Sequence, residues 1–281
     1  MTRATTAGCG AIALWSCLAL LSRAAAGVPP LELTALCFAV SATVGLGVLA
    51  ATGRLHEVSQ PPVAWAHGVG GLFGFHALYF ASLSLAPAAE ANLINYAWPL
   101  LIVLLSAPVL GLRLTRRQLA GATLAAAGCA VLLGGRARFP PGAALGYSLA
   151  FASALTWALY SVTARRLARV PTGAVAGFCA ASAILAGLAH LAFEPSVLPG
   201  SGSAAAILAL GLGPVGGAFF LWDTGMKRGD PVLLGTLAYV TPVASTALLV
   251  AGGWATPSWT IAAAALMVAA GGIIASRRAR S

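Results

Sequence analysis

The sequence predicts an all-α integral membrane protein with ten transmembrane helices, arranged as two inverted five-helix repeats around a central cavity, with both termini cytoplasmic. Three observations lead to this fold class. The chain of 281 residues is 59% hydrophobic and only 8% charged, whereas a soluble domain carries about 25% charged residues. The second half of the chain repeats the first, and the basic residues gather in alternate connections between apolar segments.

Ten apolar stretches are long enough to cross a bilayer, which takes about 20 mostly apolar residues. They are residues 6–25, 32–52, 62–84, 87–111, 117–134, 143–164, 173–193, 203–224, 230–251 and 258–275. The first stretch ends in Ala24, Ala25 and Ala26 and so also resembles a cleavable signal peptide. Its counterpart inside the chain, from Trp157 to Pro171, argues against cleavage, because no cleavage signal belongs there.

The repeat extends along nearly the whole chain at an offset of 142 or 143 positions. Its matched residues are Trp15 with Trp157, Arg23 with Arg165, Pro29 with Pro171, Tyr96 with Tyr239, and Pro99 with Pro242. We therefore predict two repeats, residues 1–138 and 139–281. Each holds an odd number of spans, so the second copy is inverted relative to the first. Secondary transporters with this architecture bind substrate near the bilayer midplane, between the repeats.

The charge distribution predicts the orientation. With ten spans, all but three of the 16 Lys and Arg residues lie on the side of the termini; the exceptions are Arg23, Arg136 and Arg138. Basic connections face the cytoplasm, so the net charge of +10 reflects membrane topology and not nucleic-acid binding. The five cysteines are scattered through apolar segments, which predicts neither a disulfide framework nor a metal site. We expect no cofactor.

Glycine and proline mark two kinds of helix feature. Gly70 and Gly74, like Gly213 and Gly217 in the second half, form GxxxG pairs, which are typical of close helix packing in membranes. Pro99 and Pro242 lie in the middle of their spans, where proline removes a backbone hydrogen bond and kinks the helix. We predict that these two kinked helices border the transport pathway and take part in gating, with a purely architectural kink as the alternative.

Polar and aromatic side chains in the middle of spans are the candidate substrate contacts, because polar groups in a span face the bundle interior. The candidates are Trp15, His76, Tyr79, Asn92, Asn95, Tyr96, Trp98, Trp157, Tyr160 and Tyr239. Helical spacing places Asn92, Asn95 or Tyr96, and Pro99 on one face. Aromatic walls with a few polar groups suit an amphipathic solute, and core packing is the alternative role for these aromatic residues.

Three roles are open for His76: an interior residue whose hydrogen bonds are made within the protein, an element of a proton relay, or a contact with the ligand. All acidic residues, including Glu90 and Asp223, fall near predicted span ends. The lack of a carboxylate in mid-membrane weakens the case for sodium binding or a carboxylate proton relay. Facilitated diffusion and coupling through His76 both remain open. No Lys or Arg is expected at mid-depth, which argues against phosphorylated substrates.

Two sequence stretches resemble a known family. APAAEANLINYAWPL at 86–100 and LTRRQLAG at 114–121 are similar to the EamA-type carriers of the drug/metabolite transporter superfamily, and the resemblance covers nearly the whole chain. Within that family, His76 and the aromatic-rich fourth span resemble most the YddG-type exporters of aromatic amino acids. The EamA-type carriers as a whole commonly have Glu at the position of Leu112. This chain lacks that Glu, so no role of it is transferred here.

The resemblance implies a multi-pass protein of the bacterial inner membrane that exports amino acids by alternating access. Aromatic and other large neutral amino acids are the favoured substrates. Its expected partners are a small-molecule substrate and membrane lipids. The oligomeric state is open, a monomer included. Export of another small metabolite or drug, or a non-transporting membrane role, is the alternative. An enzyme is not expected, because the sequence contains neither HExxH nor GxSxG.

Overall fold

The structure is a computed structural model that describes residues 1–134 and 138–276. All regular structure in these residues is helical, and ten helical stretches are long and apolar enough to span a bilayer. They are Arg3–Ala24, Pro30–Ala51, Pro62–Leu85, Ala88–Leu110, Arg116–Gly134, Ala144–Leu167, Ala174–Phe193, Ser201–Arg228, Pro231–Ala251 and Trp259–Ser276. The predicted ten-span, all-helical class is confirmed, with bounds that agree to within a few residues.

Several spans are built from more than one helical segment. The first half contains α1 (Arg3–Ser16), α2 (Leu18–Ala24), α3 (Pro30–Ala51), the 3-10 turn η1 (Leu55–Val58), α4 (Pro62–Val69), η2 (Gly70–Gly74), α5 (Phe75–Leu85), α6 (Ala88–Asn95), α7 (Trp98–Leu110) and α8 (Arg116–Gly134). The second half contains α9 (Ala144–Thr163), the 3-10 turn η3 (Ala164–Leu167), α10 (Ala174–Phe193), α11 (Ser201–Leu212), η4 (Gly213–Gly217), α12 (Ala218–Arg228), α13 (Pro231–Leu237), α14 (Val240–Ala251) and α15 (Trp259–Ser276).

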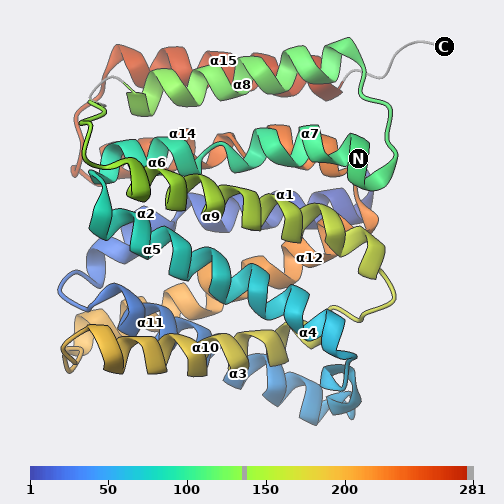
Figure 1. Ribbon diagram of the computed structural model, residues 1–281, viewed down its shortest axis with the longest axis vertical. Coiled ribbons are helices and arrows are strands. Elements are labelled where there is room, and N and C mark those ends of the chain that lie inside the picture. The colour runs from blue at the N-terminus through green and yellow to red at the C-terminus, as the bar shows by residue number, and fades with distance from the viewer. Residues whose placement is uncertain (135–137, 277–281) are drawn as a thin grey trace.

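The helices pack in layers in which the two halves of the chain interleave (Figure 1). The pair α8 and α15 forms one outer layer, and α3, α10 and α11 form the opposite one. Between them α1 packs on α12, α5 on α9, and α7 on α9 and α13. The pairs α8 with α15, α3 with α10, and α7 with α13 join spans at the same place in the two halves, whereas α1 with α12 and α5 with α9 join spans at different places. The division at residues 138 and 139 stays a prediction.

The fourth and ninth spans are interrupted at equivalent places. Helix α6 ends at Asn95 and α7 begins at Trp98, while α13 ends at Leu237 and α14 begins at Val240. The breaks lie before Pro99 and Pro242 because a proline ring clashes with the carbonyl four residues earlier. The predicted kinks are therefore two-residue turns between helical segments of the same span. The gating role of the two prolines stays a prediction.

The two GxxxG pairs bound π-helical segments, η2 and η4, at the repeat offset of 143 (70 + 143 = 213). The prediction that they pack helices closely is wrong for Gly70, where an added methyl group would have nothing within 4 Å, and for Gly74, where the nearest atom would be 3.9 Å away. Close approach occurs instead between α8 and α15. A methyl group on Gly121 would lie 2.5 Å from the carbonyl oxygen of Gly271.

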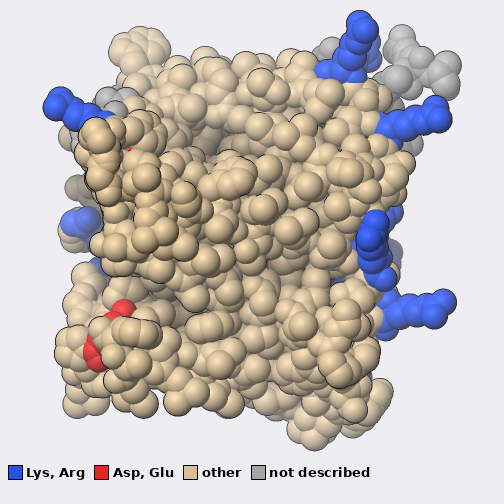
Figure 2. Space-filling view, in the orientation of Figure 1, with Lys and Arg blue, Asp and Glu red and all other residues tan. Residues whose placement is uncertain are grey.

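The two ends of the bundle differ in charge (Figure 2). One end, called the basic end below, carries Arg3, Arg54, Arg113, Arg116, Arg117, Arg165, Arg166, Arg169, Lys227 and Arg228, which lie at or near the span ends on the side of the N-terminus. The opposite end carries Arg23 and Arg138 together with Glu32, Glu90 and Glu194. Arg136, Arg277, Arg278 and Arg280 lie outside the described residues.

Candidate substrate site

Three of the predicted tryptophans meet in the middle of the bundle. Trp15 comes from the end of α1, Trp98 from the start of α7 and Trp157 from α9. Their ring centroids lie 5.7 to 6.3 Å apart and each pair meets edge-on, the arrangement that aromatic quadrupoles favour. Trp98 and Trp157 are buried and Trp15 is partly exposed. The structure brings these three together, and their contact with a substrate stays a prediction.

Two aromatic residues of α12 complete this cluster, and the sequence analysis did not single them out. The ring of Trp222 lies 5.0 Å from that of Trp15, and the ring of Phe219 lies 5.7 Å from that of Trp157. The repeat offset of 143 positions could have identified them, because it relates Phe219 to His76 and Trp222 to Tyr79. Phe219 and Trp222 are thus the counterparts of two residues that were predicted, His76 and Tyr79.

The π-helical segments orient two site residues through backbone carbonyls. His76 Nδ1 lies 2.7 Å from the carbonyl oxygen of Leu72 in η2, and the Trp15 indole N–H donates to the carbonyl of Pro214 in η4 over 2.9 Å. A carbonyl only accepts, so His76 carries hydrogen on Nδ1 and keeps Nε2 for another partner. Among the described residues none forms a hydrogen bond with that Nε2 atom.

His76 is surrounded by aromatic rings and retains partial exposure. Its ring centroid lies 5.3 Å from Phe38, 5.1 Å from Phe75 and 6.4 Å from Phe219. One turn later on α5, the Tyr79 hydroxyl donates to Asn92 Oδ1 on α6 over 3.1 Å. His76, Tyr79 and Asn92 are all partly exposed although they lie within spans. They form a polar group on one side of the tryptophan cluster.

Asn95 is committed to helix packing. Its side chain is buried, and its amide donates to Ser153 Oγ on α9 over 2.9 Å. The Ser153 hydroxyl in turn donates to the carbonyl of Phe75. This chain of bonds joins α6, α9 and α5 close to the polar group, so Asn95 positions α6, while its predicted substrate contact stays a prediction.

Tyr96 and Tyr239 lie apart from the tryptophan cluster. They pack with Cys129 and Val268 against α8 and α15, and Tyr239 is almost fully buried. The prediction of one shared face for Asn92, Asn95 or Tyr96, and Pro99 assumes an unbroken α-helix. The Tyr96 N–H donates to the Asn92 carbonyl over 2.9 Å, so the helical spacing is kept as far as Tyr96, and the shared substrate face stays a prediction.

Tyr160 lies on the side of the tryptophan cluster nearer the basic end. It is buried, its ring lies 5.2 Å from Trp157, and it stacks on His67 at 4.7 Å. The absence of a side chain at Gly71 in η2 makes room for the Tyr160 ring, which a methyl group there would overlap. Tyr160 therefore joins the site to a second polar region that contains His67.

Comparisons with known proteins agree with this architecture. The EamA-like transporter family matches residues 3–134 and 144–277, one stretch in each half. The aromatic amino acid exporter YddG of Ancylobacter novellus is 51% identical over 99% of this chain and 98% of its own. The exporter of the same name from Salmonella typhimurium is 28% identical over 88% of this chain and 87% of its own. A protein of known crystal structure, 50% identical, superposes with a TM-score of 0.94 over 98% of both chains.

Proposed function

Because the chain belongs to the EamA-like transporter family, we propose that it exports aromatic and other large neutral amino acids by alternating access. The protein is a multi-pass transporter of the bacterial inner membrane. The substrate class rests on the names of its relatives, which are aromatic amino acid exporters, and on the site described above.

The observation that carries the proposal is the pairing of an aromatic cluster with a small uncharged polar group. Trp15, Trp98 and Trp157 offer ring faces and edges to an aromatic side chain, and such contacts contribute about 0.5 to 1.5 kcal/mol each beyond area burial. His76 Nε2 and the Tyr79–Asn92 pair offer donors and acceptors to the amino and carboxylate groups. A zwitterion has no net charge and so suits a site without a fixed ion.

The proposed direction is from the basic end to the opposite end. The excess of Arg and Lys at the basic end supports its placement in the cytoplasm, with both termini on that side. The partly exposed His76 and Tyr79 lie on α5, whose C-terminal end approaches the opposite, external face. The buried Trp222 and Tyr160 lie nearer the cytoplasmic face. This asymmetry supports a site that is closed toward the cytoplasm.

Uptake of labelled amino acids into liposomes that contain the purified protein tests the proposal. We expect saturable uptake of phenylalanine, tyrosine and tryptophan, with weaker uptake of leucine and none of aspartate or lysine. Saturable uptake of none of these, with protein shown to be folded, would overturn the substrate class. Repeating the assay with an imposed pH gradient separates facilitated diffusion, which ignores the gradient, from proton coupling, which follows it.

A further inference from the structure

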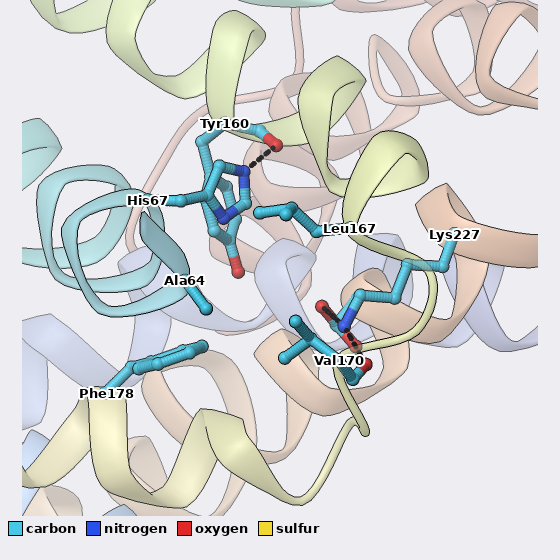
Figure 3. A pocket seen from close by; sticks show the side chains of 8 residues that line it. Ala64, His67, Tyr160, Leu167, Val170, Phe178 and Lys227 are labelled. Atoms are coloured by element: carbon cyan, nitrogen blue, oxygen red, sulfur yellow. Dashed lines mark hydrogen bonds and ion pairs between the residues drawn. The ribbon is translucent and has the colours of Figure 1, made fainter. Parts of the chain in front are cut away.

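A buried ion pair joins α12 to a neighbouring connection at the basic end, and the site described above does not use it. Lys227 Nζ lies 2.8 Å from Asp223 Oδ1, and the two side chains are only 5% and 4% exposed (Figure 3). Lys227 also donates to the carbonyl of Val170 over 2.8 Å, while the Thr172 hydroxyl donates to Asp223 Oδ2 over 2.7 Å. Both charges therefore bind the segment that joins η3 to α10.

The sequence prediction placed Lys227 in a basic connection after the eighth span, whereas the structure extends that span to Arg228; Asp223 lies near the span end, as predicted. Both lie in the last two turns of the eighth span, and both are buried. A buried charge loses its hydration, and its attraction to a partner compensates only when the remaining hydrogen bonds are satisfied. Ionisable residues within membrane spans are rare and usually functional. The bonds to Val170 and Thr172 meet this need only while α12 lies against that segment.

Two features distinguish the start of α12. The π-helical η4 directly precedes α12, and π-helical turns often occur at functional sites of helices. A groove of about 360 Å³ runs beside η4 and α12, bordered by Gly217 and Phe220 on one side and by Val44 and Val48 of α3 on the other. The start of α12 thus borders an open groove, while its middle is held by the bond from the Trp222 indole N–H to Ser161 Oγ and its end by the ion pair.

The first half of the chain repeats the π-helical segment and the half-helix at the opposite end, but not the ion pair, whose counterparts are Phe80 and Ser84. There η2 precedes α5, the counterpart of α12 at the repeat offset, and α5 is linked to α6 by the Tyr79–Asn92 hydrogen bond. That link joins neutral, partly exposed groups, whereas the link of α12 joins buried charges. The half-helix α12 is thus linked to its neighbour by buried charges, and α5 by a neutral, partly exposed hydrogen bond.

We propose that α12 is the inner gate of the transporter and that Asp223 and Lys227 are positioning residues that hold it closed through Val170 and Thr172. The inference rests on the proposed transport function and adds the residues that regulate access to the site from the basic end. When α12 moves away, Trp222 leaves the tryptophan cluster with it and the site opens toward that end. A cavity of about 10 Å³, lined by Ala64, His67, Tyr160 and the ion pair, lies where water would first enter.

The test measures access from the basic end without any substrate, so an error in the proposed substrate class leaves it interpretable. Ala64→Cys provides a buried reporter beside the pair. A membrane-impermeant maleimide is added to inverted vesicles, and labelling at position 64 is read by mass spectrometry, which separates it from the five native cysteines. We expect Lys227→Met to raise the labelling rate about fivefold or more, the size of a modest coupling between two states.

A second variant guards against misfolding, because Lys227→Met leaves Asp223 charged and buried. The double variant Asp223→Leu with Lys227→Met removes both charges, a replacement that is often neutral for stability, and it should raise labelling equally. The matched control is Glu194→Gln, which weakens a pair of the same spacing, His190–Glu194, at the opposite end. Unchanged labelling in the folded double variant, or an equal rise in Glu194→Gln, would overturn the proposed gate.

Discussion

Gly71 and Gly70 are adjacent glycines of η2 whose surroundings predict opposite effects of a single methyl group. At Gly71 the methyl group would overlap the ring of Tyr160, whereas at Gly70 nothing lies within 4 Å. The Tyr160 ring has little room to yield, since it stacks on His67 at 4.7 Å and lies 5.2 Å from Trp157. Overpacking of this kind costs about 1 to 3 kcal/mol, so Gly71→Ala should be destabilised by that amount.

Gly70→Ala should be neutral or slightly stabilising, because alanine loses about 0.5 to 1 kcal/mol less conformational freedom than glycine in a helix. Thermal unfolding of the two variants in the same detergent, followed by tryptophan fluorescence, compares them directly. With about 2 °C for each kcal/mol in a chain of this size class, Gly71→Ala should melt roughly 2 to 6 °C below the wild type. Equal midpoints for Gly70→Ala and Gly71→Ala would refute the packing of η2 against Tyr160.

Two further substitutions separate substrate contacts from packing contacts. Tyr79→Phe removes a hydroxyl that the proposed site offers to the substrate. Loss of one such hydrogen bond, about 0.5 to 1.5 kcal/mol, should raise the KM for phenylalanine uptake roughly 2- to 12-fold; an unchanged KM would remove the Tyr79–Asn92 pair from the site. Asn95→Ala removes the amide that donates to the buried Ser153 hydroxyl. The variant protein should lose about 1 to 3 kcal/mol of stability and melt at a lower temperature. The KM of the folded variant for phenylalanine should equal that of the wild type. A raised KM with an unchanged melting point would instead place Asn95 in contact with substrate.

The span number and bounds were predictable because the energetics behind them are local. Burial of 20 apolar residues in lipid depends on composition within one segment, so the ten spans agree with the structure. The interruptions before Pro99 and Pro242 were also accessible, since the clash of a proline ring is local as well. The π-helical form of Gly70–Gly74 was not, because the same glycines suit either a close helix crossing or a widened turn, and contacts with other helices decide between them.

The positions of some candidate site residues could be predicted, and the contacts that were missed all depend on packing between separate segments. Helical spacing correctly related residues within one unbroken segment, such as His76 and Tyr79 on α5. It did not reveal that Tyr96 packs beside Cys129 and Val268 of α8 and α15, because that contact depends on how separate spans pack together. Asp223 and Lys227 have the spacing of an ion pair on a helix, but their burial depends on α12 lying against the segment that contains Val170, which no single-sequence pattern reveals.

The central claim is that an aromatic amino acid is held between the tryptophan cluster and His76. Efflux of labelled phenylalanine from liposomes, compared between the wild type and the variants His76→Ala and Trp98→Ala at equal amounts of folded protein, tests it most directly. We predict that each variant loses most of the saturable flux, because one removes the polar contact and the other a wall of the cluster. Wild-type flux in both folded variants would contradict the assignment of this site.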